Sequence, residues 1–238
     1  DKNEKCELLH AARLTGARDN AYTGAKTETT VDKLTPSIKR DTSKCVLCGR
    51  CIERCKNAHG LSVLGFEKRG FKTIVAPAEN RSFKDSPCIL CGQCVSVCPT
   101  GALMEVSEIE KVDEAMKAGK FVVVQTAPAV RAALGEEFGM PVGTLVTGKM
   151  VAALRRLGFK KVFDTNFAAD LTIMEEATEL LHRMKTGGTL PMITSCSPGW
   201  VNYCEYYYGD LLPHLSSCKS PHEMFGAILK SYYCEKTG

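Results

Sequence analysis

Cys45-Val46-Leu47-Cys48-Gly49-Arg50-Cys51-Ile52-Glu53-Arg54-Cys55 and Cys88-Ile89-Leu90-Cys91-Gly92-Gln93-Cys94-Val95-Ser96-Val97-Cys98-Pro99 are the two stretches that decide the fold. Both follow the pattern C-x2-C-x2-C-x3-C, which is typical of proteins that hold two [4Fe–4S] clusters. In that pattern three cysteines of a run bind one cluster, and the fourth, which we expect at the start of a helix, binds the other. We therefore predict a first set of ligands, Cys45, Cys48, Cys51 and Cys98, and a second set, Cys88, Cys91, Cys94 and Cys55.

Zinc and disulfides are the alternatives for so many cysteines. Pairs of C-x2-C also build four-thiolate zinc sites, but such sites usually stop at two pairs. Here each run has a third cysteine at the same spacing and a fourth after three residues, and Pro99 follows the second run. The pattern therefore favours iron–sulfur clusters. The thirteen cysteines, with no signal peptide, indicate a reducing, low-oxygen compartment rather than a disulfide framework.

Length and charge narrow the class of protein. A chain of 238 residues has room for two modest domains, each with its own core. The formal net charge is only +4, and no dense Lys/Arg block interleaves with aromatic residues, so nucleic acid is not an expected partner. The chain has no apolar run long enough to cross a membrane. We expect a cytoplasmic protein of an anaerobic organism or compartment.

The chain divides into three parts by pattern. Residues 1–40 are polar and weakly patterned, and the Thr/Lys-rich stretch from Thr23 to Thr35 predicts a linker or extended arm. Residues 41–106 hold both cysteine runs, an internal repeat that indicates a duplicated, ferredoxin-like α+β domain. Between the runs, residues 60–86 alternate apolar and polar side chains and predict a short hairpin over the clusters.

Residues 107–238 show a different pattern, in which buried strands alternate with helices. Strands are expected at 121–125, 161–163 and 192–194, and helices at 128–138 and 170–184. On the second helix Leu171, Met174, Ala177, Leu181 and Met184 recur on one face, as in a helix packed against a core. The alternation predicts an α/β domain with a parallel sheet, in which functional residues gather where strands end.

A further cysteine stands at the end of the third expected strand. Thr194-Ser195-Cys196-Ser197-Pro198-Gly199-Trp200 precedes a helix, and the positive end of a helix dipole favours a thiolate. Cys196 is therefore a candidate metal ligand or proton carrier. A buried structural cysteine is the alternative.

This motif, with Ala169 to Glu176 before it and Ser216-Ser217-Cys218-Lys219-Ser220-Pro221 after it, resembles the [FeFe]-hydrogenase family. The resemblance runs from Cys45 to the C-terminus. The family's first signature segment reads Thr-Ser-Cys-Cys-Pro-x-Trp and contributes to the H-cluster, a [4Fe–4S] cube bridged by cysteine to a diiron centre. The resemblance implies an α+β two-[4Fe–4S] ferredoxin-like domain followed by part of an α/β [FeFe]-hydrogenase catalytic domain.

The resemblance also implies roles for individual residues. Cys196 matches the cysteine that passes a proton to the diiron site. The residues that match the family's proton path are Glu176, Glu179, Arg183 and Ser216. Glu176 and Glu179 are three residues apart on the expected helix, so both lie near one face and could hand on a proton. Taken alone, that spacing is more typical of a solvated helix face.

Two residues depart from the family pattern within the expected cofactor site. Ser197 stands where many members have the cysteine that binds the cubane, and serine is a harder, poorer ligand for iron; either Cys196 takes the ligand role, or cluster binding is altered. His222 stands where we expect glutamine, and it could titrate near the active site or be a hydrogen-bonded core residue. The other candidate cofactor contacts are Pro198 of the motif and Ala127 and Pro128, whose loop resembles the one over the diiron unit.

The sequence also resembles only part of the family. The second and third signature segments do not occur before Gly238, so this chain alone should not retain an H-cluster, and we expect a fragment truncated at both ends. Asp1 to Leu8 resembles the end of a cluster motif of multi-subunit hydrogenases, which makes Cys6 a candidate ligand of a further cluster. Cys204, Cys218 and Cys234 have no spacing partners and are interpreted as buried or free thiols.

The resemblance predicts a catalytic subunit of the multi-subunit, NAD(P)-linked type. Electrons from a redox partner, either a ferredoxin or NAD(P)H-oxidising flavoprotein subunits, would pass through the two clusters to the H-cluster, where H2 is interconverted with protons and electrons. The alternatives are a non-catalytic, hydrogenase-like iron–sulfur electron carrier or sensor, which Ser197 favours, and a ferredoxin joined to an unrelated α/β domain.

Overall fold

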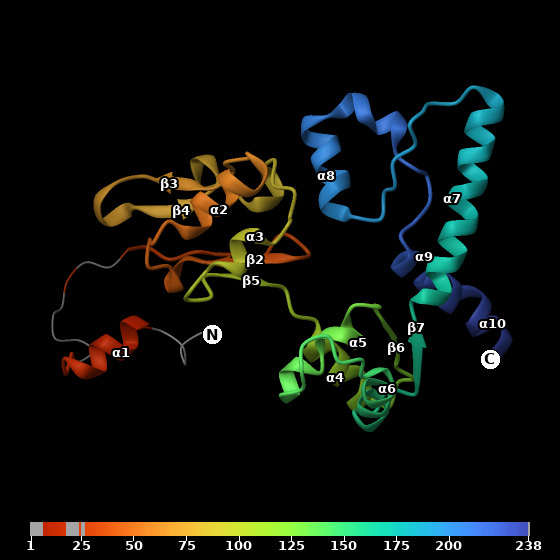
Figure 1. Ribbon diagram of the computed structural model, residues 1–238. Coiled ribbons are helices and arrows are strands. Elements are labelled where there is room, and N and C mark those ends of the chain that lie inside the picture. Colours follow the sequence, from red (N-terminus) through yellow and green to blue (C-terminus); the bar gives the residue numbers. More distant parts are fainter. Residues whose placement is uncertain (1–6, 18–23, 25–26, 238) are drawn as a thin grey trace. The chain divides into compact units, whose positions relative to one another are not determined.

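A computed structural model describes residues 7–17, 24 and 27–237 of the chain (Figure 1). The chain divides into two compact units, Asp1–Ser107 and Glu108–Gly238. None of the helices in the described ranges has the length and apolar composition that crossing a bilayer requires.

The first unit contains a three-stranded antiparallel sheet. Its strands are β1 (Val31–Asp32), β2 (Ile38–Asp41) and β5 (Leu103–Glu105), in the order β1-β2-β5. The expected arm therefore supplies strands as well as linker, and it also contains helix α1 (Glu7–Leu14). Along β2 burial alternates, with Ile38 and Arg40 facing inward, as the two-residue period of a strand requires.

The two cysteine runs fold in the same way, which confirms the internal repeat. In each run a leucine before the second cysteine has positive φ, 55° at Leu47 and 57° at Leu90. A glycine then starts a helix, α2 (Arg50–His59) after Gly49 and α3 (Gln93–Ser96) after Gly92. The expectation that the fourth cysteine stands at the start of a helix is wrong. Because the glycine lies before the third cysteine, Cys55 falls inside α2 and Cys98 follows α3.

The segment between the runs contains the predicted hairpin. Strands β3 (Gly65–Glu67) and β4 (Ile74–Ala76) pair antiparallel. Leu64 and Val75 from this segment are buried in one cluster with Ile38, Phe83 and three of the cysteines, so the hairpin covers the cysteine-bearing core. The short 3-10 helices of this unit are Thr42–Lys44, Gly70–Lys72, Ala78–Asn80 and Phe83–Asp85.

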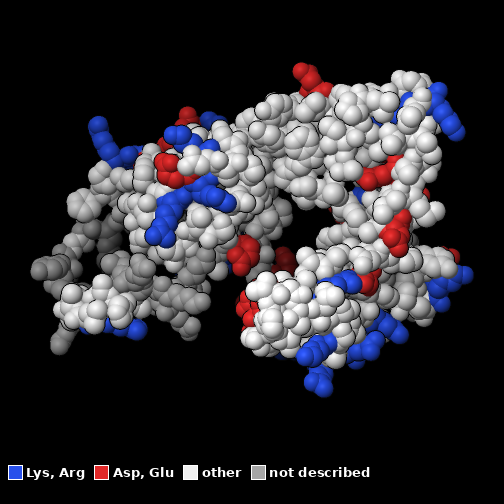
Figure 2. Space-filling model, viewed as in Figure 1, with Lys and Arg blue, Asp and Glu red and all other residues white. Residues whose placement is uncertain are grey.

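The second unit begins with helix α4 (Ile109–Lys117) and a parallel strand pair. Strand β6 (Val123–Thr126) pairs with β7 (Lys161–Asp164), as two of the three expected strands should. Between them lie α5 (Val130–Ala133), a 3-10 turn (Glu136–Phe138) and α6 (Thr147–Arg156). The last turn of α6 carries Arg155 and Arg156, where cations complement the negative end of a helix dipole. Figure 2 shows Lys and Arg side chains gathered along the lower edge of the second unit.

The third expected strand does not form. Residues 192–194 make only one parallel bridge, between Ile193 and Leu215, with hydrogen bonds from Ile193 N to His214 O (2.8 Å) and from Ser216 N to Ile193 O (2.7 Å). Pro191 and Pro198 flank this segment, and proline cannot donate to a strand ladder. The parallel sheet of the second unit therefore has two strands in the part of the chain that the structure describes.

Helix α7 (Asn166–Thr186) is longer than expected and presents a different face to the core. The predicted apolar stripe is wrong as a buried face, since Met174, Leu181 and Met184 are exposed. The buried positions are Ala168 and Thr172, on the side that packs against α9 (Pro221–Ile228) (Figure 1). The remaining elements are α8 (Pro198–Tyr207), a 3-10 helix (Gly209–His214), a π-helix (Leu229–Tyr233) and α10 (Cys234–Thr237).

Candidate metal centres and proton path

The first cysteine set lies around a single cavity in the first unit. This first cavity offers about 450 Å³ of space, solvent at its mouth included, and its wall also includes Arg40, Val75 and Leu103. Cys98 joins three cysteines that lie more than forty residues before it in the chain because β5, which follows Cys98, pairs with β2. The structure therefore brings together the four thiols that the sequence assigns to one cluster.

The second cysteine set lies around another cavity of the same unit. This second cavity offers about 390 Å³ of space, solvent at its mouth included, and is lined by Cys55, Cys88, Cys91 and Cys94. Its other walls are largely apolar and include Ile38, Leu64 and Phe83. Cys55 reaches this cavity rather than the first because it lies one helical turn beyond Cys51 on α2. The exchange of fourth cysteines between the runs is thus present in the geometry.

Burial governs the chemistry of these thiols. It raises the pKa of Cys51 and Cys88 to about 11 and that of Cys94 to about 12, and neighbouring cysteines add to the rise. Cys98 differs: burial alone would raise its pKa, but hydrogen bonds from the backbone of Leu103 and Thr100 lower it. Iron ions favour thiolate sulfur, so a bound cluster would hold these groups deprotonated.

Both sets fit a cubic cluster better than a single ion. None of the twelve cysteines in the described ranges is disulfide-bonded. Within those ranges, no three Cys, His, Asp or Glu side chains converge on a point where one metal ion could sit. The four sulfurs of each set instead surround a cavity, and four thiolates around a cavity are the donor set of a [4Fe–4S] cluster.

A third cavity, in the second unit, collects the residues expected near the H-cluster. It is open to solvent and offers about 1470 Å³ of space, solvent at its mouth included, and its walls include Ala127, Pro128, Cys196, Pro198 and His222. Cys196 is exposed and lies two residues before the start of α8. Cys196 and His222 are both exposed among the described residues, which favours a cavity-facing role for each over that of a buried core residue.

Ser197 is the one predicted cofactor contact that does not line the third cavity. It is the N-cap residue of α8, but its side chain makes no capping hydrogen bond. Among the described residues, Cys196 is the only cysteine that lines this cavity. A cubane with four thiolate ligands is not completed by this chain.

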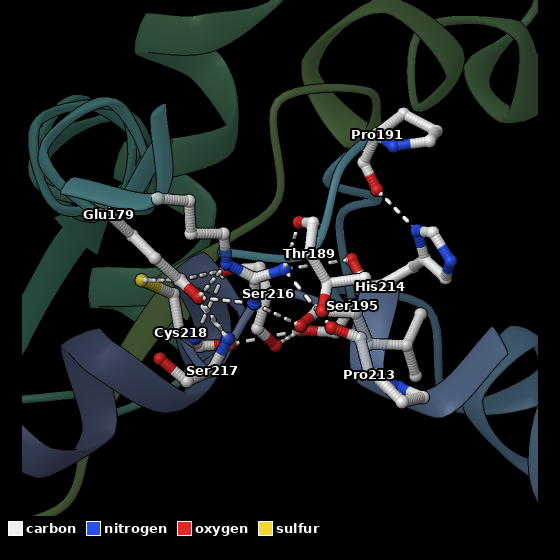
Figure 3. Close-up of polar contacts among 11 residues, drawn as sticks. Glu179, Thr189, Pro191, Ser195, Pro213, His214, Ser216, Ser217 and Cys218 are labelled. Carbon is white, nitrogen blue, oxygen red and sulfur yellow. Dashed lines mark hydrogen bonds and ion pairs between the residues drawn. The ribbon is translucent and has the colours of Figure 1, made fainter. Parts of the chain in front are cut away.

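Glu179, Arg183 and Ser216 of the predicted proton path form one hydrogen-bonded cluster (Figure 3). The Glu179 carboxylate accepts from Arg183 Nη2 at 2.6 Å and from the Ser216 hydroxyl at 2.7 Å. The backbone N–H of Ser217 donates to both of its oxygens, at 3.2 and 3.1 Å. Only 16% of the Glu179 side chain is exposed, so the interpretation of a solvated helix face is wrong for this residue.

These donors decide the charge of Glu179. Burial alone would raise the pKa of its carboxyl group, but hydrogen bonds from Ser216, Arg183 and Ser217, with the charge of Arg183, lower it to about 2. Arg183 in turn donates to Thr189 O (3.2 Å), Pro213 O (3.1 Å) and Leu215 O (2.7 Å). The guanidinium therefore fixes both the carboxylate and the loop that carries Ser216.

Cys218 belongs to this cluster, although sequence reasoning treated it as an unpartnered thiol. Its Sγ donates to Glu179 Oε2 at 3.6 Å. Burial raises the pKa of its thiol, and the charges of Glu179 and Glu176 raise it further. Glu176 is half-buried, and its charge acts on Cys218. The spacing Ser-x-Cys, which puts both side chains on one side of an extended segment, was the available signal.

The segment that carries Cys196 is hydrogen-bonded through Ser195 to the loop that carries Ser216 and Cys218. Ser195 Oγ donates to Ser216 O at 2.9 Å and to Cys218 O at 3.0 Å. Of the remaining cysteines, Cys204 is fully buried and Cys234 is exposed. Cys6 lies outside the residues that the structure describes.

Comparisons with known proteins agree with this geometry. Residues 44–102 match the 4Fe-4S dicluster domain family, which confirms the preference for iron–sulfur over zinc, and residues 120–237 match the family described as iron only hydrogenase large subunit, C-terminal domain. The NADP-reducing hydrogenase subunit HndD of Solidesulfovibrio fructosivorans is 50% identical over 244 residues, covering 100% of this chain. Iron hydrogenase 1 of Clostridium pasteurianum is 48% identical over 241 residues, again covering 100%.

A solved structure of an [FeFe]-hydrogenase from Chlamydomonas reinhardtii is 46% identical, with a TM-score of 0.54 over 56% of this chain and 35% of that chain. This chain spans 42% of the length of each of the two curated relatives. Two cluster-binding cavities in a ferredoxin-like unit, followed by a matching hydrogenase segment, identify the chain as a member of the [FeFe]-hydrogenase family.

Proposed function

We propose that this chain carries electrons through two [4Fe–4S] clusters to the H-cluster of an [FeFe]-hydrogenase that interconverts H2 with protons and electrons. The observation that carries the proposal is the sorting of eight cysteines into two cavities with exchanged fourth members. When bound, the clusters supply one-electron transfer, and the H-cluster supplies the diiron centre where H2 chemistry occurs. In this proposal the eight cysteines hold the two [4Fe–4S] clusters, and the residues around Glu179 carry protons toward the third cavity.

The residues around Glu179 support the proton role. Ser216 and Cys218 both direct a hydrogen toward Glu179 Oε2, so a proton can be exchanged without moving a heavy atom far. Protonating a carboxyl group with a pKa of about 2 at neutral pH costs roughly 7 kcal/mol, at about 1.4 kcal/mol per pKa unit. A turnover of about 10³ per second corresponds to a barrier of roughly 13 kcal/mol. This cost is smaller than that barrier, so it does not by itself exclude Glu179 as a proton carrier.

Ligands beyond this chain would be needed for the H-cluster. The third cavity receives one thiol, from Cys196. Ser197, where a second thiol is expected, has a hydroxyl and does not line this cavity. The catalytic activity, as well as the partners, is accordingly proposed for the longer parent protein. We propose as electron donor a ferredoxin or NAD(P)H-oxidising flavoprotein subunits, in a low-oxygen cytoplasm where the thiols stay reduced.

The test is H2 evolution by the parent protein under anaerobic conditions, with a reduced viologen as electron donor. Cys196→Ala should lower turnover by roughly 10²-fold or more, as expected for loss of a proton-transfer group. Cys234→Ala is the matched control, because Cys234 is exposed and does not line the third cavity. Unchanged turnover in Cys196→Ala would contradict the role of this residue.

A non-catalytic, hydrogenase-like electron carrier or sensor is the second candidate. It is favoured by Ser197, whose hydroxyl replaces a thiol and does not face the third cavity. This function predicts that the parent protein holds iron and sulfide and is reducible, but neither makes nor consumes H2. The viologen assay of the unaltered parent therefore separates the two candidates.

A further inference from the structure

The two cluster cavities differ in one inward-facing residue of the same strand. On β2, Ile38 lines the second cavity and Arg40 lines the first. Both residues are buried, with 3% and 4% of their surface exposed. They are two positions apart and therefore share a face of the strand. One cavity consequently meets an aliphatic side chain where the other meets a guanidinium.

Arg40 is held in place but is not fully satisfied. Its Nη1 donates to Val75 O and its Nη2 to Asn80 Oδ1, both at 3.0 Å. Its Nε is buried without any hydrogen-bond partner. A buried N–H without an acceptor is unfavourable and calls for an explanation. The sulfur-lined first cavity beside it is where an acceptor would sit.

Arg40 is the charged residue that distinguishes the wall of the first cavity from that of the second. The wall of the second cavity, among the described residues, contains His59 but no Asp, Glu, Lys or Arg. The first cavity has Asp41 as well as Arg40, but the Asp41 carboxylate accepts from Ser43 and lies near Lys39 and Lys44. Burial lowers the pKa of Arg40, yet a guanidinium stays protonated at neutral pH. Its charge also reaches Cys45 of the first set.

We propose that Arg40 makes the cluster of the first set easier to reduce than the cluster of the second set, by its buried positive charge and its free Nε–H. The inference rests on the proposed function only in requiring that both cavities hold [4Fe–4S] clusters. Each reduction adds one electron from an external reductant and breaks no bond. The cluster with its thiolates thereby becomes more negative by one charge, which a nearby buried cation and N–H donor stabilise.

The experiment is a potentiometric titration of the 238-residue chain, reconstituted anaerobically with iron and sulfide and reduced with dithionite. Electron spin resonance follows each cluster separately. Arg40→Gln should shift the equilibrium of one cluster toward the oxidised form by at least tenfold, which is about 59 mV for one electron. Arg69→Gln is the matched control, since Arg69 is exposed and lines neither cavity, and it should leave both potentials unchanged.

The potential that Arg40→Gln shifts must be that of the cluster bound by the first set of cysteines. In a Cys91→Ala background, which removes a ligand of the second cavity, Arg40→Gln should still lower the remaining potential. A shift that disappears in this background, or no shift at all, overturns the inference.

If the Arg40→Gln chain loses a cluster, Arg40→Met takes its place. It also removes both the charge and Nε–H, so a lower potential supports the inference and an unchanged one overturns it. Wild-type chain with fewer than about eight irons would instead contradict the proposed function, so the two failures are distinguishable.

Discussion

Glu179 shows how a few donors determine the state of a single side chain. Arg183, Ser216, Ser217 and Cys218 all direct hydrogens at its two oxygens. Charge-assisted hydrogen bonds of this kind favour the ionised form of a carboxyl group. The residue is therefore an anchor for the loop that carries Ser216 as well as a proposed proton carrier.

Replacing this carboxylate should destabilise the fold in a pH-dependent way. Glu179→Gln leaves the Arg183 charge without its partner, and we expect a loss of about 2 kcal/mol at pH 6. The folded pKa of about 2 lies below the ordinary value of 4.5, so the stabilisation is complete above pH 4.5 and disappears as the pH falls toward 2. Urea unfolding of the iron-free chain, followed by circular dichroism at pH 6, 4 and 3, measures the difference.

Glu175→Gln provides the control for this prediction. Glu175 is exposed on the same helix, so its substitution should change the unfolding free energy by less than about 0.5 kcal/mol at each pH. A Glu179→Gln effect that stays constant from pH 6 to pH 3 would show that the carboxylate is not held ionised by its donors.

At the scale of elements, two helices that border the third cavity begin differently. Both α8 and α9 start with a Ser-Pro pair, Ser197-Pro198 and Ser220-Pro221. The Ser220 hydroxyl accepts a hydrogen bond from Glu223 N at 3.2 Å, whereas Ser197 makes no such bond. The same two residues thus stabilise one helix terminus and leave the other with a free, exposed side chain beside Cys196.

Two matched substitutions test this difference. Ser220→Ala should cost about 1 kcal/mol of stability, since it removes a capping hydrogen bond. Ser197→Ala should cost less than about 0.5 kcal/mol, because no such bond is lost. Chemical unfolding of both variants measures the two values. Equal losses would mean that Ser197 also stabilises its helix, which would contradict the difference between the two helix starts.

For the whole molecule, the exchange of cysteines between the runs makes cluster loss non-additive. Each cluster carries four irons, so Cys48→Ala and Cys91→Ala should each lower the iron content from about eight to about four. Adding Cys98→Ala to Cys48→Ala should remove no more iron, because both residues line the first cavity. Adding Cys98→Ala to Cys91→Ala should remove nearly all of it.

Iron and acid-labile sulfide analysis of the purified chains gives these numbers directly. Cys234 is an exposed thiol in the second unit, so the Cys234→Ala chain should retain about eight irons. The opposite pairing, with Cys98→Ala adding to the loss in the Cys48→Ala chain and not in the Cys91→Ala chain, would show that each run binds its own cluster.

Features that depend on local spacing and ligand chemistry were predictable from the sequence. The two cysteine sets follow from a repeated pattern, and the hairpin between the runs follows from alternating side chains. A strand that is flanked by prolines was harder to predict. Residues 192–194 have the composition of a buried strand, yet they form only one β-bridge. The stripe on α7 was wrong because apolar periodicity does not say which face of a helix has a partner.

The sequence by itself determined the family to which the chain belongs and predicted which thiols line the same cavity, because the ligand spacing repeats along the chain. Only the tertiary structure decided that Arg40 lies beside the first cavity and that Cys218 touches Glu179. Both contacts join segments that are far apart in the sequence, Arg40 with Val75 and Cys98, and Cys218 with α7. Their electrostatic consequences arise from burial and proximity, which the order of residues does not encode locally.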